Sequence, residues 1–147
     1  FMSAMSNYLE NKLVDHLFRG ISFSAPSSMY VALYTAAPSD TGGGTEVTGG
    51  DYQRVQYDPS YSAWKGTNNE VTNTPSAGTT GTTSNASAIT FPAPTDDWGH
   101  ITHFAILDAN TSGNLYFWGA LSIPKTVNNG DAAPSFSTSA LTIQLDN

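Results

Sequence analysis

The stretch 98-WGHITHFAILDANTSGNLYFWGAL-121 decides the fold. Two largely apolar runs, at 100–107 and 115–121, flank the polar segment 108–114, whose Asp, Asn and Gly residues tolerate the backbone angles of a chain reversal. Short runs rich in aromatic and β-branched residues are typical of strands. The sequence therefore predicts a hairpin of two neighbouring antiparallel strands.

More short strands are predicted before and after this hairpin. The segment 29–35 alternates two rows of apolar residues, as expected of a strand that is covered on both faces. Further short runs, bounded by turn residues, lie at 52–57, 87–92 and 140–146. Because no helical pattern separates these runs, we expect a mainly β fold, an antiparallel and jelly-roll-like β-sandwich over residues 25–147.

One amphipathic helix is predicted ahead of the sandwich, at about residues 7–19 of an N-terminal arm that covers residues 1–24. Asn7 and Glu10 approximate a capping box, and Gly20 can supply the left-handed stop. Because so short a helix is marginal alone, it has to dock on its own sandwich or on a neighbouring subunit. Its apolar stripe, flanked by Val14, supplies four interface candidates: Leu9, Leu13, Leu17 and Phe18.

A long polar loop is predicted at about residues 58–87. Its second part, 69–87, is rich in Ser, Thr and Gly and has too few apolar residues to fold by itself, so we expect it to be mobile or ordered by a partner. Tyr61 and Trp64, near the start of the loop, are two further interface candidates. Aromatic side chains there could equally stack on sugar rings, which keeps a carbohydrate-binding module among the hypotheses.

The candidate catalytic and metal-ligating residues form no convincing site. His100 and His103 lie three residues apart on a predicted strand, so they should point to opposite faces, with His103 in the more buried row, which holds Ile101, Ala105 and Leu107. The loop from Asp108 to Gly113 resembles the start of a calcium loop but lacks the later glutamate, which leaves at most weak calcium binding. We expect no enzyme activity, no cofactor and no metal.

Charge and composition exclude several partners. Twelve acidic and five basic residues give a formal net charge of −7, which repels nucleic-acid phosphates. The sequence has no basic cluster for an anionic membrane surface and no apolar run of the roughly 20 residues that span a bilayer. We therefore expect neither nucleic acid nor a membrane as a partner, and the absence of cysteine excludes disulfides.

A set of segments in a fixed order resembles a family of small virion proteins of tailed bacteriophages, whose members are labelled head decoration, minor tail or tail fibre proteins. These segments are NYLENKLVDHLFRG, YVALYTAAP, GGGTEVTGGDYQRV, SNASAITFP, WGHITHFAILDA, GNLYFWGAL, NNGD and LTIQLD. The stretch 58–82 lies outside the resemblance. The resemblance implies a non-enzymatic structural protein of the phage particle, with no catalytic residues to carry over.

Within that family, the leading hypothesis is a capsid decoration, or cement, protein. It would bind the major capsid protein on the capsid exterior, as a trimer or dimer, after synthesis in the cytoplasm of the bacterial host. The alternative is a tail or tail-fibre component with tail proteins of the same phage as partners. An acidic body with an amphipathic helix and a long polar loop suits either role, because many simultaneous contacts in an assembly can offset the entropy lost on ordering such segments.

Overall fold

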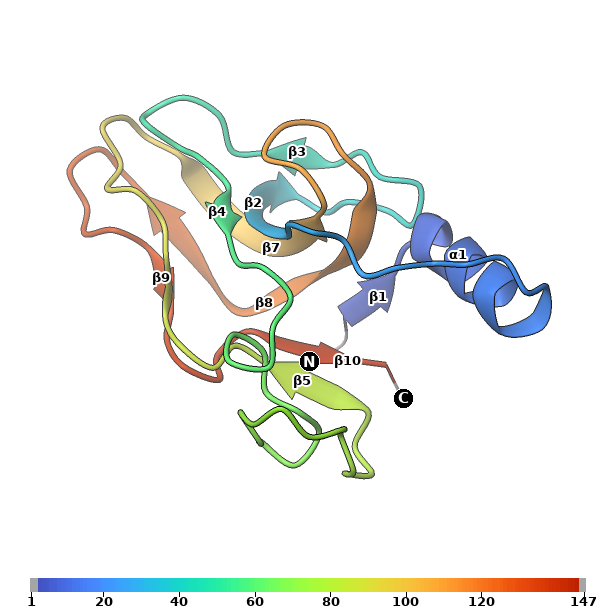
Figure 1. The fold of residues 1–147 in the computed structure, drawn as a ribbon. Coiled ribbons are helices and arrows are strands. Elements are labelled where there is room, and N and C mark those ends of the chain that lie inside the picture. The colour runs from blue at the N-terminus through green and yellow to red at the C-terminus, as the bar shows by residue number, and fades with distance from the viewer. Residues whose placement is uncertain (1–2, 146–147) are drawn as a thin grey trace.

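The computed structural model describes residues 3–145, so the first two and last two residues of the predicted units 1–24 and 25–147 lie outside the described residues. All of its strand pairs are antiparallel, which confirms a mainly β fold with one N-terminal helix (Figure 1). The elements are β1 (Ser3–Met5), α1 (Asn7–Phe18), β2 (Tyr30–Ala36), β3 (Thr45–Glu46), β4 (Val55–Gln56), β5 (Thr82–Ser84), β6 (Ile89–Thr90), β7 (Gly99–Leu107), β8 (Leu115–Val127), β9 (Ser135–Phe136) and β10 (Thr142–Gln144).

The predicted hairpin is β7 and β8, at the centre of a six-stranded sheet. The strand order is β1-β8-β7-β2-β3, with β4 also paired to β2. In the turn, the Asp108 carboxylate accepts hydrogen bonds from the backbone N–H and the side-chain amide of Asn114, at 2.6 and 2.7 Å. Gly113 has a φ of +85°, a left-handed conformation that glycine adopts without strain. The prediction that residues 108–114 form the reversal of a hairpin is therefore confirmed.

The core lies between this sheet and two separate two-stranded sheets, β5 with β10 and β6 with β9. Val31 and Phe104, from the central strands, pack in one cluster with Ile89 of β6 and Ile143 of β10. A jelly-roll sandwich would place one continuous second sheet here. The structure has two short ones instead, in which β5 pairs with β10 over three residues and β6 pairs with β9 over two.

An irregularity in the hairpin corrects the predicted arrangement of side chains on β7. Ile101 pairs with Lys125 but His103 pairs with Ala120, so the single residue between them on β7 faces residues 121–124 of β8. The alternation of faces shifts there, and Ile101 packs in the same cluster as Phe104. The expectation that Ile101 shares a row with His103 is therefore wrong. We call residues 121–124 the β8 excursion.

The helix is anchored to its own domain at its first turn. Its N-cap is Ser6, whose hydroxyl accepts a hydrogen bond from Leu9 N at 3.2 Å and donates one to the backbone oxygen of Leu115. The predicted capping box at Asn7 was therefore wrong by one residue. Leu9 is buried, and β1 pairs with β8, so the N-terminal segment forms an edge of the sheet. Gly20 ends the helix with a φ of +70°, as predicted.

The end of the predicted polar loop is ordered by a buried amide. Asn85 is completely buried, and its Nδ2 donates to the backbone oxygens of Ser87 and Ser137, both at 2.8 Å. Its Oδ1 accepts from Leu141 N at 2.9 Å. These bonds tie the loop to the C-terminal segment, and residues 82–84 form β5, so the expectation that 69–87 is mobile or ordered by a partner is wrong for these three residues.

Replacing this amide should destabilise the fold strongly. Asn85→Leu removes three hydrogen bonds and leaves the N–H of the buried Leu141 without a partner, so we expect the free energy of unfolding to fall by about 1–3 kcal/mol. Guanidinium denaturation, followed by circular dichroism, measures the change in the free energy of unfolding. Asn129→Leu is the control, because Asn129 is exposed and its side chain makes no hydrogen bond within residues 3–145. Equal denaturation midpoints for the two variants would contradict this role of Asn85.

Candidate functional site

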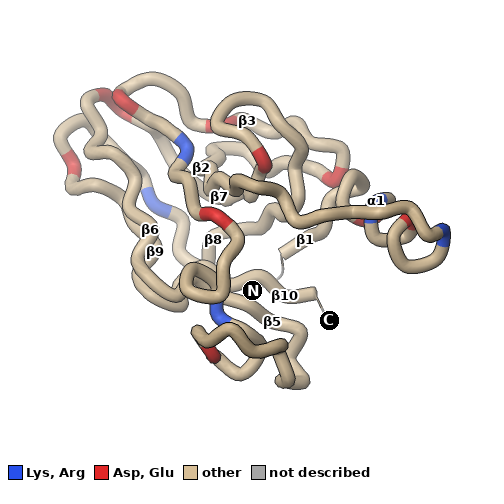
Figure 2. Tube along the Cα trace, viewed as in Figure 1, with Lys and Arg blue, Asp and Glu red and all other residues tan. Residues whose placement is uncertain are grey.

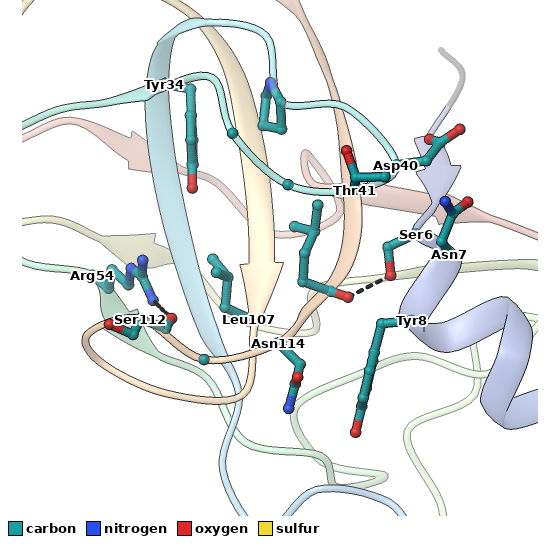
Figure 3. Close-up of a pocket in the computed structure, with 15 residues that line it drawn as sticks. Ser6, Asn7, Tyr8, Tyr34, Asp40, Thr41, Arg54, Leu107, Ser112 and Asn114 are labelled. Atoms are coloured by element: carbon teal, nitrogen blue, oxygen red, sulfur yellow. Dashed lines mark hydrogen bonds between the residues drawn. The ribbon is translucent and has the colours of Figure 1, made fainter.

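A cavity of about 340 Å³ lies where the start of α1 meets the loop after β2 and the β7–β8 turn (Figure 3). Leu107 and Leu115 form apolar lining, and Asp40 and Asn114 contribute polar side chains. The volume is at the lower end of the range for small-molecule sites. A few polar groups around an apolar surface can bind a small polar ligand, but the cavity offers no pair of residues arranged for acid–base or nucleophilic chemistry.

Tyr34 is the polar side chain in this cavity that sequence reasoning missed. Its residue is only 6% exposed, it points from β2 into the space that Figure 3 shows, and its hydroxyl has no hydrogen-bond partner within residues 3–145. Burial, and to a lesser extent the nearby Glu46 carboxylate, raises the pKa of this hydroxyl above its ordinary value. It therefore stays a neutral group that can both donate and accept. No local pattern pointed to Tyr34 as a cavity residue, because it lies in an apolar strand pattern.

Arg54 holds the wall of the cavity together. Its side chain is 7% exposed, and its Nε and Nη2 donate to the Glu46 carboxylate at 2.8 and 2.7 Å. Nη1 donates to the backbone oxygens of Ala109 and Ser112, at 2.7 and 2.8 Å. The hydrogen bonds with Glu46 raise the pKa of the guanidinium. With these bonds made, Arg54 acts as a clamp between β3 and the β7–β8 turn.

The histidines and the candidate calcium loop serve the fold. His100 Nδ1 lies 3.0 Å from Thr126 Oγ1, and His103 Nδ1 lies 2.7 Å from Thr102 Oγ1. Burial lowers the pKa of His103. The Asp108 carboxylate is bonded to Asn114 within the turn. Among residues 3–145, we find no group of three or more His, Cys, Asp or Glu side chains that could hold a metal ion.

The predicted interface residues divide into buried and exposed sets. Leu9 is buried in its own domain and Leu13 is half-buried. Tyr61 is exposed, whereas Trp64 is half-buried and packs edge-on against Tyr57 with ring centroids 5.2 Å apart. Tyr61 and Trp64 both line a cavity of about 410 Å³. The carbohydrate-binding hypothesis for this pair stays a prediction.

The rest of the helix presents an uncovered apolar surface. Leu17 is 67% exposed and Phe18 is 81% exposed, and Val14 and Ile21 are about half exposed. The spacing of Val14, Leu17 and Phe18 places them on one face of the helix, and Ile21 follows just beyond the helix end at Gly20. We call Val14, Leu17, Phe18 and Ile21 the α1 stripe. In Figure 1, this end of α1 projects away from the sheets.

Within the described residues, a β domain therefore anchors the start of α1 and leaves the apolar side chains at its end uncovered. Residues 4–144 match the family described as "Podophage GP4 fiber I protein gp80", so the chain belongs to that family of phage fibre proteins. No curated protein matches the chain. Within residues 3–145, no helix is long and apolar enough to cross a membrane.

The family match confirms a non-enzymatic structural protein of a bacteriophage particle. It also corrects the leading hypothesis of the sequence analysis. The description names a fibre protein, so the tail-fibre alternative is supported over a capsid decoration protein on the capsid exterior. The sequence segments alone could not separate the two roles, because a small β domain with an amphipathic helix is compatible with either.

Removing the Arg54 clamp should destabilise the protein. Arg54→Gln leaves the partly buried Glu46 carboxylate without its charge partner, so we expect the free energy of unfolding to fall by about 2–4 kcal/mol. Arg19→Gln is a matched control, because Arg19 is exposed and its pair with Asp15, at 3.0 Å, is of the i,i+4 kind, worth about 0.5 kcal/mol or less. Urea denaturation of both variants measures the difference. A small, equal effect for the two would show that Arg54 is no clamp.

Proposed function

We propose that the chain is a building block of a phage fibre that is held to neighbouring proteins of the same particle through the α1 stripe. The observation that supports this proposal is the exposure of Leu17 and Phe18 on a helix whose first turn is firmly docked. Partners are other fibre or tail proteins, and assembly as a dimer or trimer is part of the proposal. The role needs binding surfaces and no chemistry.

The energetic argument starts from the cost of exposing apolar side chains to water. Burial of one leucine or phenylalanine side chain contributes about 1.5–3 kcal/mol. Scattered exposed apolar residues are ordinary, but contiguous apolar patches on a soluble domain mark interaction sites. The α1 stripe is contiguous, and its helix is held in shape by its own bonds, including Ile21 N to the backbone oxygen of Asp15 at 3.1 Å. A preformed surface of this kind loses little entropy on docking.

The arrangement of α1 also explains how a structural protein can both fold alone and attach. Ser6 and Leu9 belong to the interior of the domain, so the helix keeps its position without a partner. The second half of the helix contributes little to that interior. Substitutions in the second half should therefore weaken assembly and leave folding unchanged, and the test rests on this difference.

The double variant Leu17→Ser/Phe18→Ser should assemble poorly while it folds normally. Loss of about 3–6 kcal/mol of burial predicts at least a hundredfold weaker attachment, whereas exposed positions usually change unfolding free energy by less than about 0.5 kcal/mol. Phage particles carrying each variant are purified, and the copies per particle are counted by quantitative mass spectrometry. Val71→Ser, an exposed apolar residue of the 58–87 segment, is the control.

A normal copy number for the double variant would refute attachment through the α1 stripe. So would unfolding of the isolated double variant, measured by circular dichroism, because the stripe would then belong to the domain's own core.

A further inference from the structure

The turn that follows β8 holds the one Asn-Gly pair of the sequence, Asn129 and Gly130. Both residues are exposed, and the side-chain amide of Asn129 makes no hydrogen bond within residues 3–145. The Asp131 N–H donates to the backbone oxygen of Asn128 at 3.1 Å, and Gly130 has a φ of +80°. Residues 128–131 therefore form a hydrogen-bonded β-turn with glycine at its third position, which we call the NNGD turn.

We propose that Asn129 is a site of spontaneous covalent modification, in which its side-chain amide is lost as ammonia, and that the fold restrains this reaction. The inference is independent of the proposed function, because it concerns the chemical lifetime of the chain and not its attachment. Two observations carry it. Glycine follows Asn129, so no side chain shields the backbone nitrogen that attacks, and the structure ties that nitrogen to another loop.

The reaction consumes one water molecule and releases one ammonia. The Gly130 backbone nitrogen gives its proton to hydroxide and forms a bond to Cγ of the Asn129 side chain. The bond between Cγ and Nδ2 then breaks, and Nδ2 takes up a proton from water and leaves as ammonia. The product is a five-membered succinimide ring. Water opens this ring at either of its two carbonyl groups, which yields aspartate or isoaspartate at position 129.

The fold restrains the attacking nitrogen. The Gly130 N–H donates to the backbone oxygen of Pro94 at 3.0 Å, and an N–H that is engaged in a hydrogen bond gives up its proton less readily. The Asn129 N–H donates to the Asp97 carboxylate at 2.8 Å. These two bonds tie the NNGD turn to the loop that precedes β7. Attack on Cγ therefore requires local opening of the turn, and the rate follows the small population of opened chains.

The modified chain fits the turn less well than the original one. Isoaspartate adds one carbon to the main chain, which displaces the N–H groups of the turn from their acceptors. Either product also adds a negative charge close to Asp97 and Asp131, whose carboxylates already bond to the turn. Figure 2 shows acidic residues in the neighbouring loops at this end of the molecule, in a chain with a formal net charge of −7.

Reaction rates in the folded and the denatured chain test the inference. The protein is incubated at mildly alkaline pH, with and without concentrated guanidinium chloride, and conversion at each asparagine is followed by peptide mass spectrometry. In denaturant we expect Asn129 to react faster than every other asparagine, including Asn128, its exposed neighbour in the same turn. In the folded chain we expect Asn129 to react at least about tenfold more slowly than in denaturant. Equal rates in the two samples, or faster conversion of another asparagine in denaturant, would overturn the inference.

A second measurement links the restraint to the bonds of the turn. Asp97→Ala removes the acceptor of the Asn129 N–H, so we expect conversion at Asn129 without denaturant to become about fivefold faster. Asp15→Ala is the matched control, because it removes a carboxylate that pairs with Arg19 on α1. Equal rates in the two folded variants contradict the restraint. If circular dichroism shows that Asp97→Ala does not fold, the comparison of the folded and denatured unsubstituted chain decides alone.

Discussion

The pairing of β7 with both β2 and β8 is the constraint on which the rest of the structure depends. β2 carries Val31 and β7 carries Phe104 and Ile106, the completely or almost completely buried centre of the core. The two small sheets, the Asn85 network and the Arg54 clamp are all built against this layer or its turn. The register of β7 and β8 also fixes the position of the β8 excursion, so one pairing sets both the core and this irregularity.

The division of α1 into a buried start and an exposed end connects this core to function. Ser6 donates to the Leu115 backbone oxygen at the first residue of β8, so the central hairpin positions the helix. Leu13 is still half-buried, whereas Leu17 and Phe18 at the end of the helix are exposed. In the proposed role, folding and attachment would use different side chains, so the chain could fold before it assembles.

Much of the fold followed from periodicity and turn chemistry. The hairpin, the strand at 29–35, the helix and its end at Gly20 were all predicted from local patterns. Features that depend on contacts with residues far away in the sequence were not predicted. β1 is three residues long with no pattern of its own, the excursion exists only relative to β7, and Ser6 caps the helix through Leu115. The α1 stripe was visible as an apolar pattern, but its exposure follows from where the domain ends, which no local pattern encodes.

Hydrogen–deuterium exchange of the isolated chain and of the same chain in phage particles tests the central claim most directly. The account holds that β2, β7 and β8 form the stable core alone and that α1 is covered only by neighbours. It predicts slow exchange of β7 amides in both samples, and slower exchange across residues 14–21 in particles than in the isolated chain. Equal exchange of residues 14–21 in both samples, or rapid exchange of β7 in the isolated chain, would contradict it.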